Sequence, residues 1–198
     1  MKMRLALLIL LLPASVRADV ADDIIRQLTP FVVMRGMFQQ VKTIKISKKP
    51  LRSSGDFVVA KGKGVLWRTA RPMSSTMKVT AGEVSQIKDG RTVFRLRAEE
   101  QPALRFITRV IFAVFAADVA ELRRNFEISG LVEHGRWRAD LIPRDAMVAK
   151  VVAEVHLRGG TALEDIEFRE ANGDRTIIRF SVLRLETVLS PAEGALLE

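Results

Sequence analysis

The chain has 198 residues, of which 48% are hydrophobic and 28% are charged. This balance indicates a folded chain with a sizeable buried core, and it excludes an intrinsically disordered protein. The formal net charge of +9 would suit a nucleic-acid partner, but the amino-terminal residues must be read before that charge is interpreted.

The amino terminus has the three parts of a secretory signal peptide. Two basic residues lie within the first four positions and precede the uninterrupted apolar run Leu5–Leu12. Val16 and Ala18 then occupy the −3 and −1 positions of a cleavage site. The apolar run is far shorter than the ~20 residues that a membrane-spanning helix needs. We therefore expect residues 1–18 to be a cleaved signal peptide and residues 19–198 to form one domain.

Secretion changes how the charge is interpreted. Cleavage after Ala18 removes three basic residues and no acidic one, so the formal charge of the mature chain falls from +9 to +6. We expect no nucleic-acid partner for a secreted protein; the remaining charge favours anionic lipid headgroups or an acidic protein surface. The chain has no cysteine, and its first mature residue is Asp19. A cysteine at that position carries the acyl chains of bacterial lipoproteins, so we expect a soluble protein without a lipid anchor.

Two elements are expected at the start of the mature chain. Residues Asp19–Leu28 carry acids first and apolar residues at four-residue spacing, which predicts a short amphipathic helix. Phe31–Ile46 is expected to be extended. Gly36 lies inside this run and marks a bulge or bend, because glycine in a strand interior often does so.

Two strand-like runs follow, Asp56–Ala60 and Gly64–Thr69, joined by a short link rich in glycine and lysine. Successive side chains of a strand point to opposite faces. Phe57 and Val59 therefore share one face of the first run, and Trp67 lies with the apolar face of the second. The runs predict a meandering antiparallel sheet with large apolar residues on one side.

A further hairpin is predicted around Asp89-Gly90, because Asp-Gly between two strand-like runs is a strong hairpin signal. The runs on either side are Glu83–Ile87 and Thr92–Arg97. The second alternates cleanly, so Phe94 and Leu96 are expected to point inward.

The middle of the chain predicts one long helical segment, Ala103–Arg124. Its apolar residues recur every three or four positions and include Ile107, Ile111 and Phe115. A helix this apolar must be buried nearly all round, or it must face something apolar that is not permanent protein.

The rest of the chain predicts strands joined by turns. Trp137 points inward by alternation, and Asn172-Gly173 is the strongest short hairpin signal in the sequence. The residues from Ser190 onward are expected to be loose. The predicted strands are Phe126–Glu133, Arg136–Ile142, Val148–Leu157, Leu163–Glu170 and Arg175–Leu185.

These elements predict a mainly β fold. We expect a curled, incomplete antiparallel β-barrel of about ten or eleven strands, because curling removes the edges that a large open sheet exposes. The short helices are expected to pack inside it as a lid.

The sequence gives little support for catalysis. His134 stands beside a glycine in an expected turn, and His156 alternates with charged residues on a polar strand face. Neither has the spacing of a metal site, and the chain has no nucleophile elbow or phosphate-binding loop. We expect no enzyme, no metal and no cofactor. A secreted hydrolase stays open as an alternative, and it requires one of these histidines beside a serine or a carboxylate.

Apolar surface is present in excess, and two interpretations of it stay open. One is an ordinary core. The other is a cavity for acyl chains with the central helix as its movable inner wall, because apolar ligand pockets are lined in this way. The candidate cavity residues are Phe38, Phe57, Val59, Trp67, Phe94, Leu96, Ile107, Ile111, Phe115 and Trp137.

The order and spacing of several short motifs resemble the LolA family of periplasmic carriers, which ferry lipoproteins from the inner to the outer membrane. The resemblance covers the whole mature chain, and the departures from the best-studied carriers indicate a divergent branch. The motifs are Phe38-Gln39-Gln40, Gly55-Asp56-Phe57, Trp67 twelve residues after Gly55, Pro72, and Val79-Thr80.

The resemblance implies a soluble, monomeric periplasmic carrier that binds acyl chains in a hydrophobic cavity and carries lipoproteins toward the outer membrane. It also implies two partners, an inner-membrane lipoprotein-releasing transporter and an outer-membrane acceptor. In the family an arginine holds the lid closed through backbone carbonyls; the matching position here is Lys61, which lacks the planar fork of donors. Lys61 is therefore a candidate lid latch, looser than the family's arginine.

Two other functions for a protein of the cell envelope stay open beside the lipoprotein carrier. One is a carrier of a free lipid or glycolipid. The other is a structural envelope protein with a filled core that binds nothing.

Overall fold

The computed structural model describes residues 20–47, 49–97, 99, 112–115 and 118–197. Residues 1–18, the expected signal peptide, lie outside the described residues. The strands are β1 (Val33–Thr43), β2 (Leu51–Ala60), β3 (Gly64–Arg71), β4 (Ser75–Thr80), β5 (Glu83–Lys88), β6 (Arg91–Arg97), β7 (Phe126–Glu133), β8 (Arg136–Pro143), β9 (Val152–Gly159), β10 (Leu163–Glu170) and β11 (Arg175–Glu186). The labelled helices are α1 (Val20–Gln27), α3 (Val119–Asn125), α4 (Ala146–Ala149) and α5 (Pro191–Leu197), and residues 112–115 are also helical.

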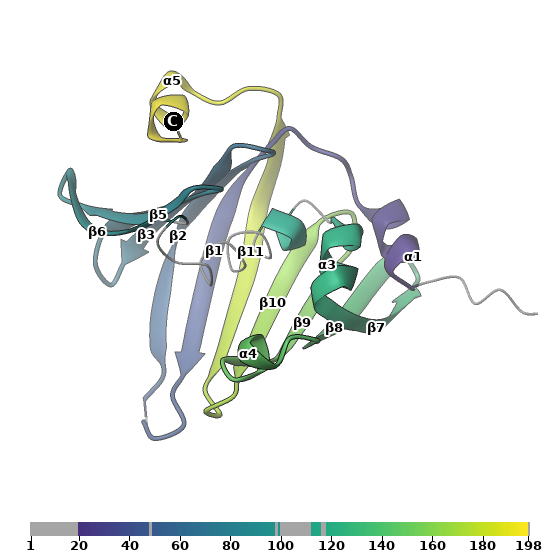
Figure 1. Cartoon of the computed structure of the whole chain (residues 1–198). Coiled ribbons are helices and arrows are strands. Elements are labelled where there is room, and N and C mark those ends of the chain that lie inside the picture. Colours follow the sequence, from purple (N-terminus) through teal and green to yellow (C-terminus); the bar gives the residue numbers. More distant parts are fainter. Residues whose placement is uncertain (1–19, 48, 98, 100–111, 116–117, 198) are drawn as a thin grey trace, which may run out of the picture.

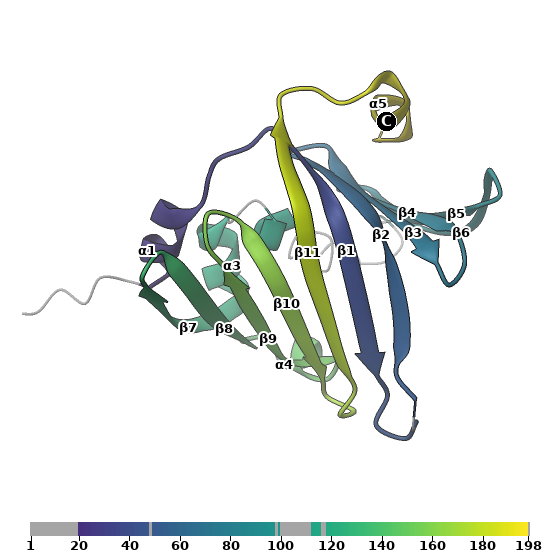
Figure 2. The same cartoon turned by 180° about the vertical axis from the view of Figure 1, so that it is seen from behind.

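All eleven strands belong to one antiparallel sheet, in the order β6-β5-β4-β3-β2-β1-β11-β10-β9-β8-β7. Most neighbours are consecutive in the chain, but β1 and β11, the first and last strands, pair in the middle of the sheet. The sheet curves strongly, and β3 to β6 turn away from the plane of β10 and β11 (Figures 1 and 2). Its edges, β6 and β7, do not meet. The prediction of a mainly β, incomplete antiparallel barrel with short helices is confirmed.

The helices α1 and α3 pack against β7 and against each other (Figure 1). They lie on the same side of the sheet as the main apolar cluster, and we call this side the inner face. None of the helices in the described part of the chain combines the length and the apolar composition needed to cross a membrane.

Gly36 lies where the pairing of β1 with β11 shifts register, between Arg35 and Met37. A Cβ atom at Gly36 would lie 2.8 Å from the Phe57 ring and 2.7 Å from a Leu183 methyl group. The predicted bulge is confirmed, and the missing side chain lets the Phe57 ring lie across β1.

The prediction of a single helical segment from 103 to 124 is wrong. Residues 112–115 are helical, but a separate helix, α3, begins at Val119. The cause is Asp118, whose side chain accepts a hydrogen bond of 3.0 Å from the backbone N–H of Glu121 and so caps a new helix. Residues 103–111 lie outside the described residues.

The strand expected from Val148 begins only at Val152. The Asp145 side chain accepts hydrogen bonds from the backbone N–H groups of Met147 and Val148, at 2.7 and 3.1 Å. These bonds start the short helix α4 in place of the first strand residues.

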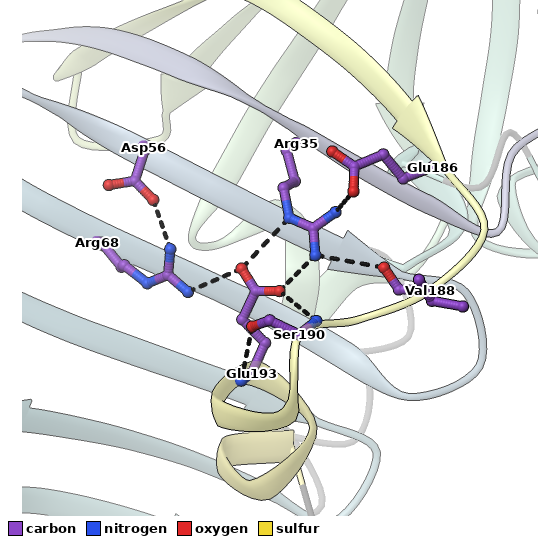
Figure 3. A network of polar contacts seen from close by, with 7 residues as sticks. All are labelled: Arg35, Asp56, Arg68, Glu186, Val188, Ser190 and Glu193. Carbon is purple, nitrogen blue, oxygen red and sulfur yellow. Dashed lines mark hydrogen bonds and ion pairs between the residues drawn. The ribbon is translucent and has the colours of Figure 1, made fainter.

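The expectation of a loose tail after Ser190 is also wrong, because residues Pro191–Leu197 form α5. Ser190 and Glu193 cap its first turn reciprocally. The backbone N–H of Ser190 donates to the Glu193 carboxylate at 3.0 Å, and the backbone N–H of Glu193 donates to the Ser190 hydroxyl at 3.3 Å (Figure 3). This is a capping box, and the proline that follows Ser190 suits the first helical position.

Glu193 also connects α5 to β1 and β3 directly, and to β2 through Arg68. Its carboxylate pairs with Arg35 on β1 and, at 3.2 Å, with Arg68 on β3; Arg68 in turn pairs with Asp56 on β2 at 2.8 Å (Figure 3). Glu193 is only 7% exposed. Hydrogen bonds from Arg35 lower the pKa of the Glu193 carboxyl to about 2, against the opposing effect of burial.

A second, smaller apolar cluster lies under α5 on the outer face of the sheet. It joins Leu197 of α5 to Val58 and Leu66, which alternate with the inward residues of β2 and β3. Leu66 is completely buried. This part of the sheet is therefore covered on both faces, which holds β1, β2 and β3 in place.

The inner face carries a cluster of five aromatic rings. Phe38 and Trp67 are stacked with their ring centroids 3.8 Å apart. Phe57 lies 6.0 Å from Trp67, and Phe180 meets Phe57 edge-on at 5.1 Å. Phe115, from the helical residues 112–115, lies 5.6 Å from Phe180 and 6.0 Å from Phe57. Strands from both halves of the sheet thus meet a single inner helical segment.

Phe94 and Leu96 do not join this cluster. The prediction that Phe94 points into the interior is wrong, since its side chain is 46% exposed. Leu96 is half-buried and lies outside both apolar clusters of the described residues. Both residues belong to the edge strand β6, which pairs with β5 alone among the described strands. Alternation identifies the two faces of a strand, but it does not show whether a face is covered.

We expect Glu193→Gln to lower the free energy of unfolding by about 2 kcal/mol near neutral pH, because it removes the buried carboxylate that pairs with Arg35 and Arg68. The pKa of Glu193 is depressed on folding, so its contribution is present above the unfolded pKa of 4.5 and is lost as the pH falls through about 2. The difference between wild type and variant in urea unfolding should therefore narrow as the pH falls below 4.5. Glu167 also has a pKa of about 2, but it is present in both proteins. Its pH-dependent contribution to the free energy of unfolding therefore cancels in the difference between wild type and variant. If the difference in unfolding free energy between wild type and Glu193→Gln did not change with pH, the depressed pKa of Glu193 would be contradicted.

Trp67→Ala should lower the free energy of unfolding by about 2–3 kcal/mol, since it removes the ring stacked on Phe38 and exposes the centre of the cluster. Phe94→Ala is the matched control, and we expect it to cost less than about 0.5 kcal/mol because its ring is on the surface. Chemical unfolding followed by circular dichroism measures both. If both variants lost the same free energy of unfolding, the aromatic cluster would contribute no more to stability than an exposed ring.

Candidate functional site

The inner face and the helical residues 112–115 line a partly open cavity of about 240 Å³. Thirteen of its fourteen described lining residues are apolar or aromatic, and Gln40 is the exception. They are Gln40, Val65, Trp67, Met77, Val79, Val114, Phe115, Phe126, Leu141, Val155, Ile166, Phe168, Ile178 and Phe180. A surface of this kind can hold a hydrocarbon chain, but it offers few groups that would orient a polar ligand.

A second cavity of about 210 Å³ lies toward the end of the sheet near α1. Its lining includes Phe31, Met34, Lys61, Trp137 and Leu163, and Lys61 is the only charged residue among the described lining residues. A third space of about 30 Å³ lies between α1, α3 and the strands β7 to β9.

Val114 lines all three spaces, and Phe115 lines the two larger ones. The helical residues 112–115 are thus a shared wall between the cavities. Val114 and Phe115 are the only described lining residues that the two larger cavities share.

The ten residues predicted for the cavity fall into four groups. Trp67, Phe115 and Trp137 line the two larger cavities. Phe38, Phe57 and Val59 are almost fully buried in the inner cluster and support the lining from below. Phe94 and Leu96 lie on the edge strand β6, away from the cavities, and Ile107 and Ile111 lie outside the described residues.

Lys61 follows β2 in the turn that leads to β3, and it is exposed. Its backbone N–H donates to the carbonyl of Val32 at 2.9 Å. Within the described residues its ammonium group has no hydrogen-bond or ion-pair partner. The lid helix to which a latch would bind includes residues outside the described part, so the latch stays a prediction.

Much of the lining comes from residues that the prediction did not include. Strands β7 to β11 contribute Phe126, Leu141, Val155, Ile166, Phe168, Ile178 and Phe180. Most of them alternate with polar residues along their strands, as inward residues do. What the sequence did not contain was a signal that the second half of the sheet faces β3 and β4 across the cavity.

The structure places His156 beside two carboxylates, one of the arrangements that the hydrolase alternative requires. His134 is exposed in the β7–β8 turn with a φ of 50°. The Nδ1 atom of His156 lies 2.5 Å from Asp140 and its Nε2 atom lies 3.0 Å from Glu154. Carboxylates thus occupy both ring nitrogens, whereas a serine hydrolase needs one nitrogen facing the serine. The described residues hold no group of three or more histidines and acids placed to bind a metal.

The model of one protein family matches most of the chain. It is described as outer membrane lipoprotein carrier protein LolA-like, and it matches residues 13–181. A search among curated protein sequences finds no match.

Several solved structures are similar to the chain at low identity. A DUF1329 family protein from Desulfovibrio piger is 12% identical, with 90% of this chain and 96% of that chain covered and a TM-score of 0.48. A LolA superfamily protein from Nitrosomonas europaea is 9% identical, with 87% and 96% covered and a TM-score of 0.46. The MucA/MucB complex of Pseudomonas aeruginosa is 14% identical, with 90% and 60% covered and a TM-score of 0.46.

The family model covers far more than half of the chain, from the expected signal peptide to the last strand of the sheet. The chain belongs to the outer membrane lipoprotein carrier protein LolA-like family.

Proposed function

We propose that this protein is a periplasmic carrier that binds the acyl chains of lipoproteins and ferries them toward the outer membrane. The observation that carries this proposal is the cavity of about 240 Å³, whose fourteen described lining residues include a single amide and no charge. In this proposal residues 1–18 are removed as a signal peptide, and residues 19–198 act as one lipid-binding domain. An inner-membrane transporter would load the carrier, and an outer-membrane acceptor would unload it.

The size of the cavities supports a movable inner wall. Ligand pockets typically have volumes of about 300–1,000 Å³, and neither of the two larger cavities reaches that range. Together they do reach it, and Val114 and Phe115 form the wall between them. We infer that an entering acyl chain displaces these side chains and fills the joined space.

The same arrangement accounts for release. Each buried methylene group of the cargo contributes about 0.8 kcal/mol, so part of an acyl chain is enough for useful affinity. Phe115 covers Phe57 and Phe180 when the cavity is empty, and it competes with the cargo for this surface. The competition limits the net affinity, which a carrier must keep low enough to pass its cargo on.

A carrier of a free lipid or glycolipid is the second candidate. It is favoured by Lys61, which stands where the resemblance implies an arginine latch and which lines the rim of the second cavity. A structural envelope protein with a filled core is disfavoured by the two large apolar cavities. In all of these cases the protein acts by binding and release and forms no covalent bond.

Brominated fatty acids test acyl binding with the two tryptophans of the chain as reporters, because bromine quenches tryptophan fluorescence on contact. In Trp137→Phe the remaining Trp67 reports on the first cavity, and in Trp67→Phe the remaining Trp137 reports on the second. We expect saturable quenching in both variants, since an acyl chain in the joined space reaches both rings. Emission that does not change in either variant would overturn the proposal.

Met77→Trp should weaken acyl binding by about tenfold, which corresponds to the burial of roughly two methylene groups. Met77 lines the first cavity and is 41% exposed, so the larger side chain blocks the entrance without overpacking the core. Met73→Trp is the matched control, because Met73 is 68% exposed and is not a lining residue. The binding constant of a fluorescent fatty acid measures both. If the two variants bind alike, the first cavity is not the binding site.

Lipoprotein carriage is tested by offering the carrier one lipoprotein in two forms, acylated and with its acylated cysteine replaced by serine. The carrier should form a soluble complex with the acylated form only, as measured by size-exclusion chromatography without detergent. Binding of free fatty acid together with rejection of the acylated protein would favour the second candidate over the first.

A further inference from the structure

The second cavity combines an apolar interior with one cation at its rim. Thirteen described residues line it, and Lys61 is the only charged one, without any acidic residue. Lys61 also lines a separate surface pocket of about 500 Å³ between the end of β2 and the segment that leads to α5. The charged residues among the described lining of that pocket are Lys61 and Lys63, again without an acid.

Backbone hydrogen bonds hold Lys61, which lines both spaces, and Lys63, which lines the surface pocket. The Lys61 N–H donates to Val32 at 2.9 Å, and the Lys63 N–H donates to Ala60 at 3.0 Å. Gly62 between them has a φ of 75°, which closes the turn tightly. Both side chains are exposed, so their ammonium groups can reach a ligand at the rim.

The neighbouring acids are already engaged. Glu193, on the helix beside the surface pocket, pairs with Arg35 and Arg68, and Glu186 pairs with Arg35. In the described part of the chain, neither Lys61 nor Lys63 has a carboxylate partner. Lys61 at the apolar cavity and Lys63 in the surface pocket therefore have no carboxylate partner among the described residues.

We propose that Lys61, together with Lys63, binds the anionic headgroup of a lipid whose acyl chain lies in the second cavity. The headgroup is a carboxylate or a phosphate, the two anions that acyl lipids commonly present. This inference rests on the proposed function only in that an acyl chain enters the cavity. It narrows the second candidate, a carrier of a free lipid, to an anionic lipid, because the acyl groups of a lipoprotein are ester- and amide-linked and carry no charge.

A lysine pair suits this role physically. An ammonium group is a compact charge with three rotatable donors and does not impose the fixed geometry of a guanidinium fork. It can therefore follow a headgroup that remains partly in water while the chain is buried. The surface pocket beside it gives a bulky headgroup room outside the apolar interior.

The test compares the delipidated full-length mature chain with cis-parinaric acid and with its methyl ester at about pH 8, where the carboxyl group is ionised. The two probes share one chain and differ in charge. Wild type should bind the acid about fivefold more tightly than the ester, and Lys61→Gln should remove this preference by weakening acid binding alone. Lys61→Arg should preserve it. Lys88→Gln is the control for loss of a positive charge, because Lys88 is exposed at the end of β5 and lines neither pocket.

Competition identifies the headgroup. Displacement of the acid by lysophosphatidic acid, but not by lysophosphatidylcholine, would assign a lipid phosphate as a ligand. Displacement by neither would restrict the site to carboxylates.

The outcomes separate this inference from the proposed function. Equal binding of acid and ester by wild type and Lys61→Gln would leave the acyl cavity standing and overturn the headgroup site. Loss of ester binding in Lys61→Gln would overturn it as well, because the lysine would then act on the cavity itself. Failure of wild type to bind either probe would overturn both proposals.

Discussion

An eleven-stranded sheet that curls without closing has an apolar inner face that its own strands cannot bury completely. In this protein short helical segments cover that face. Among them, residues 112–115 place Phe115 against Phe57 and Phe180. The apolar cavities lie between this helical segment and the strands of the sheet. The acyl-carrier proposal follows from this geometry, because an apolar cover can be exchanged for a ligand of the same chemistry.

The outer face of the sheet is stabilised by a different set of contacts, those made by α5. Glu193 joins α5 to β1 and β3 through buried ion pairs, and Leu197 adds apolar packing over Leu66 (Figure 3). These contacts fix the strands that carry the aromatic floor of the first cavity. A rigid floor under an exchangeable cover lets a ligand displace the cover without unfolding the sheet. The carboxylate of Glu193 lies on the outer face, away from the first cavity. Its protonation at low pH should therefore change the stability of the fold without acting directly on ligand binding.

Local patterns in the sequence predicted most of the strands and their inward residues, because alternation records which face meets the core. They did not predict the pairing of β1 with β11, which joins the two ends of the chain and leaves no local signal. The helix α5 did have a signal, the capping box of Ser190 and Glu193, but its seven residues are too few to show helical periodicity. The site was predicted only in part for a related reason. Alternation placed Phe94 and Trp137 equally inward, and only the curvature of the sheet decides that one is exposed and the other lines a cavity.

The central claim is that the inner cavities hold acyl chains in the cell. Native mass spectrometry of the protein purified from its own envelope, without detergent, tests this most directly. The account predicts a population heavier than the mature chain by the mass of an acyl lipid or acylated peptide, which organic extraction removes and which Met77→Trp reduces. Protein that is free of ligand, with Met77→Trp indistinguishable from wild type, would contradict it.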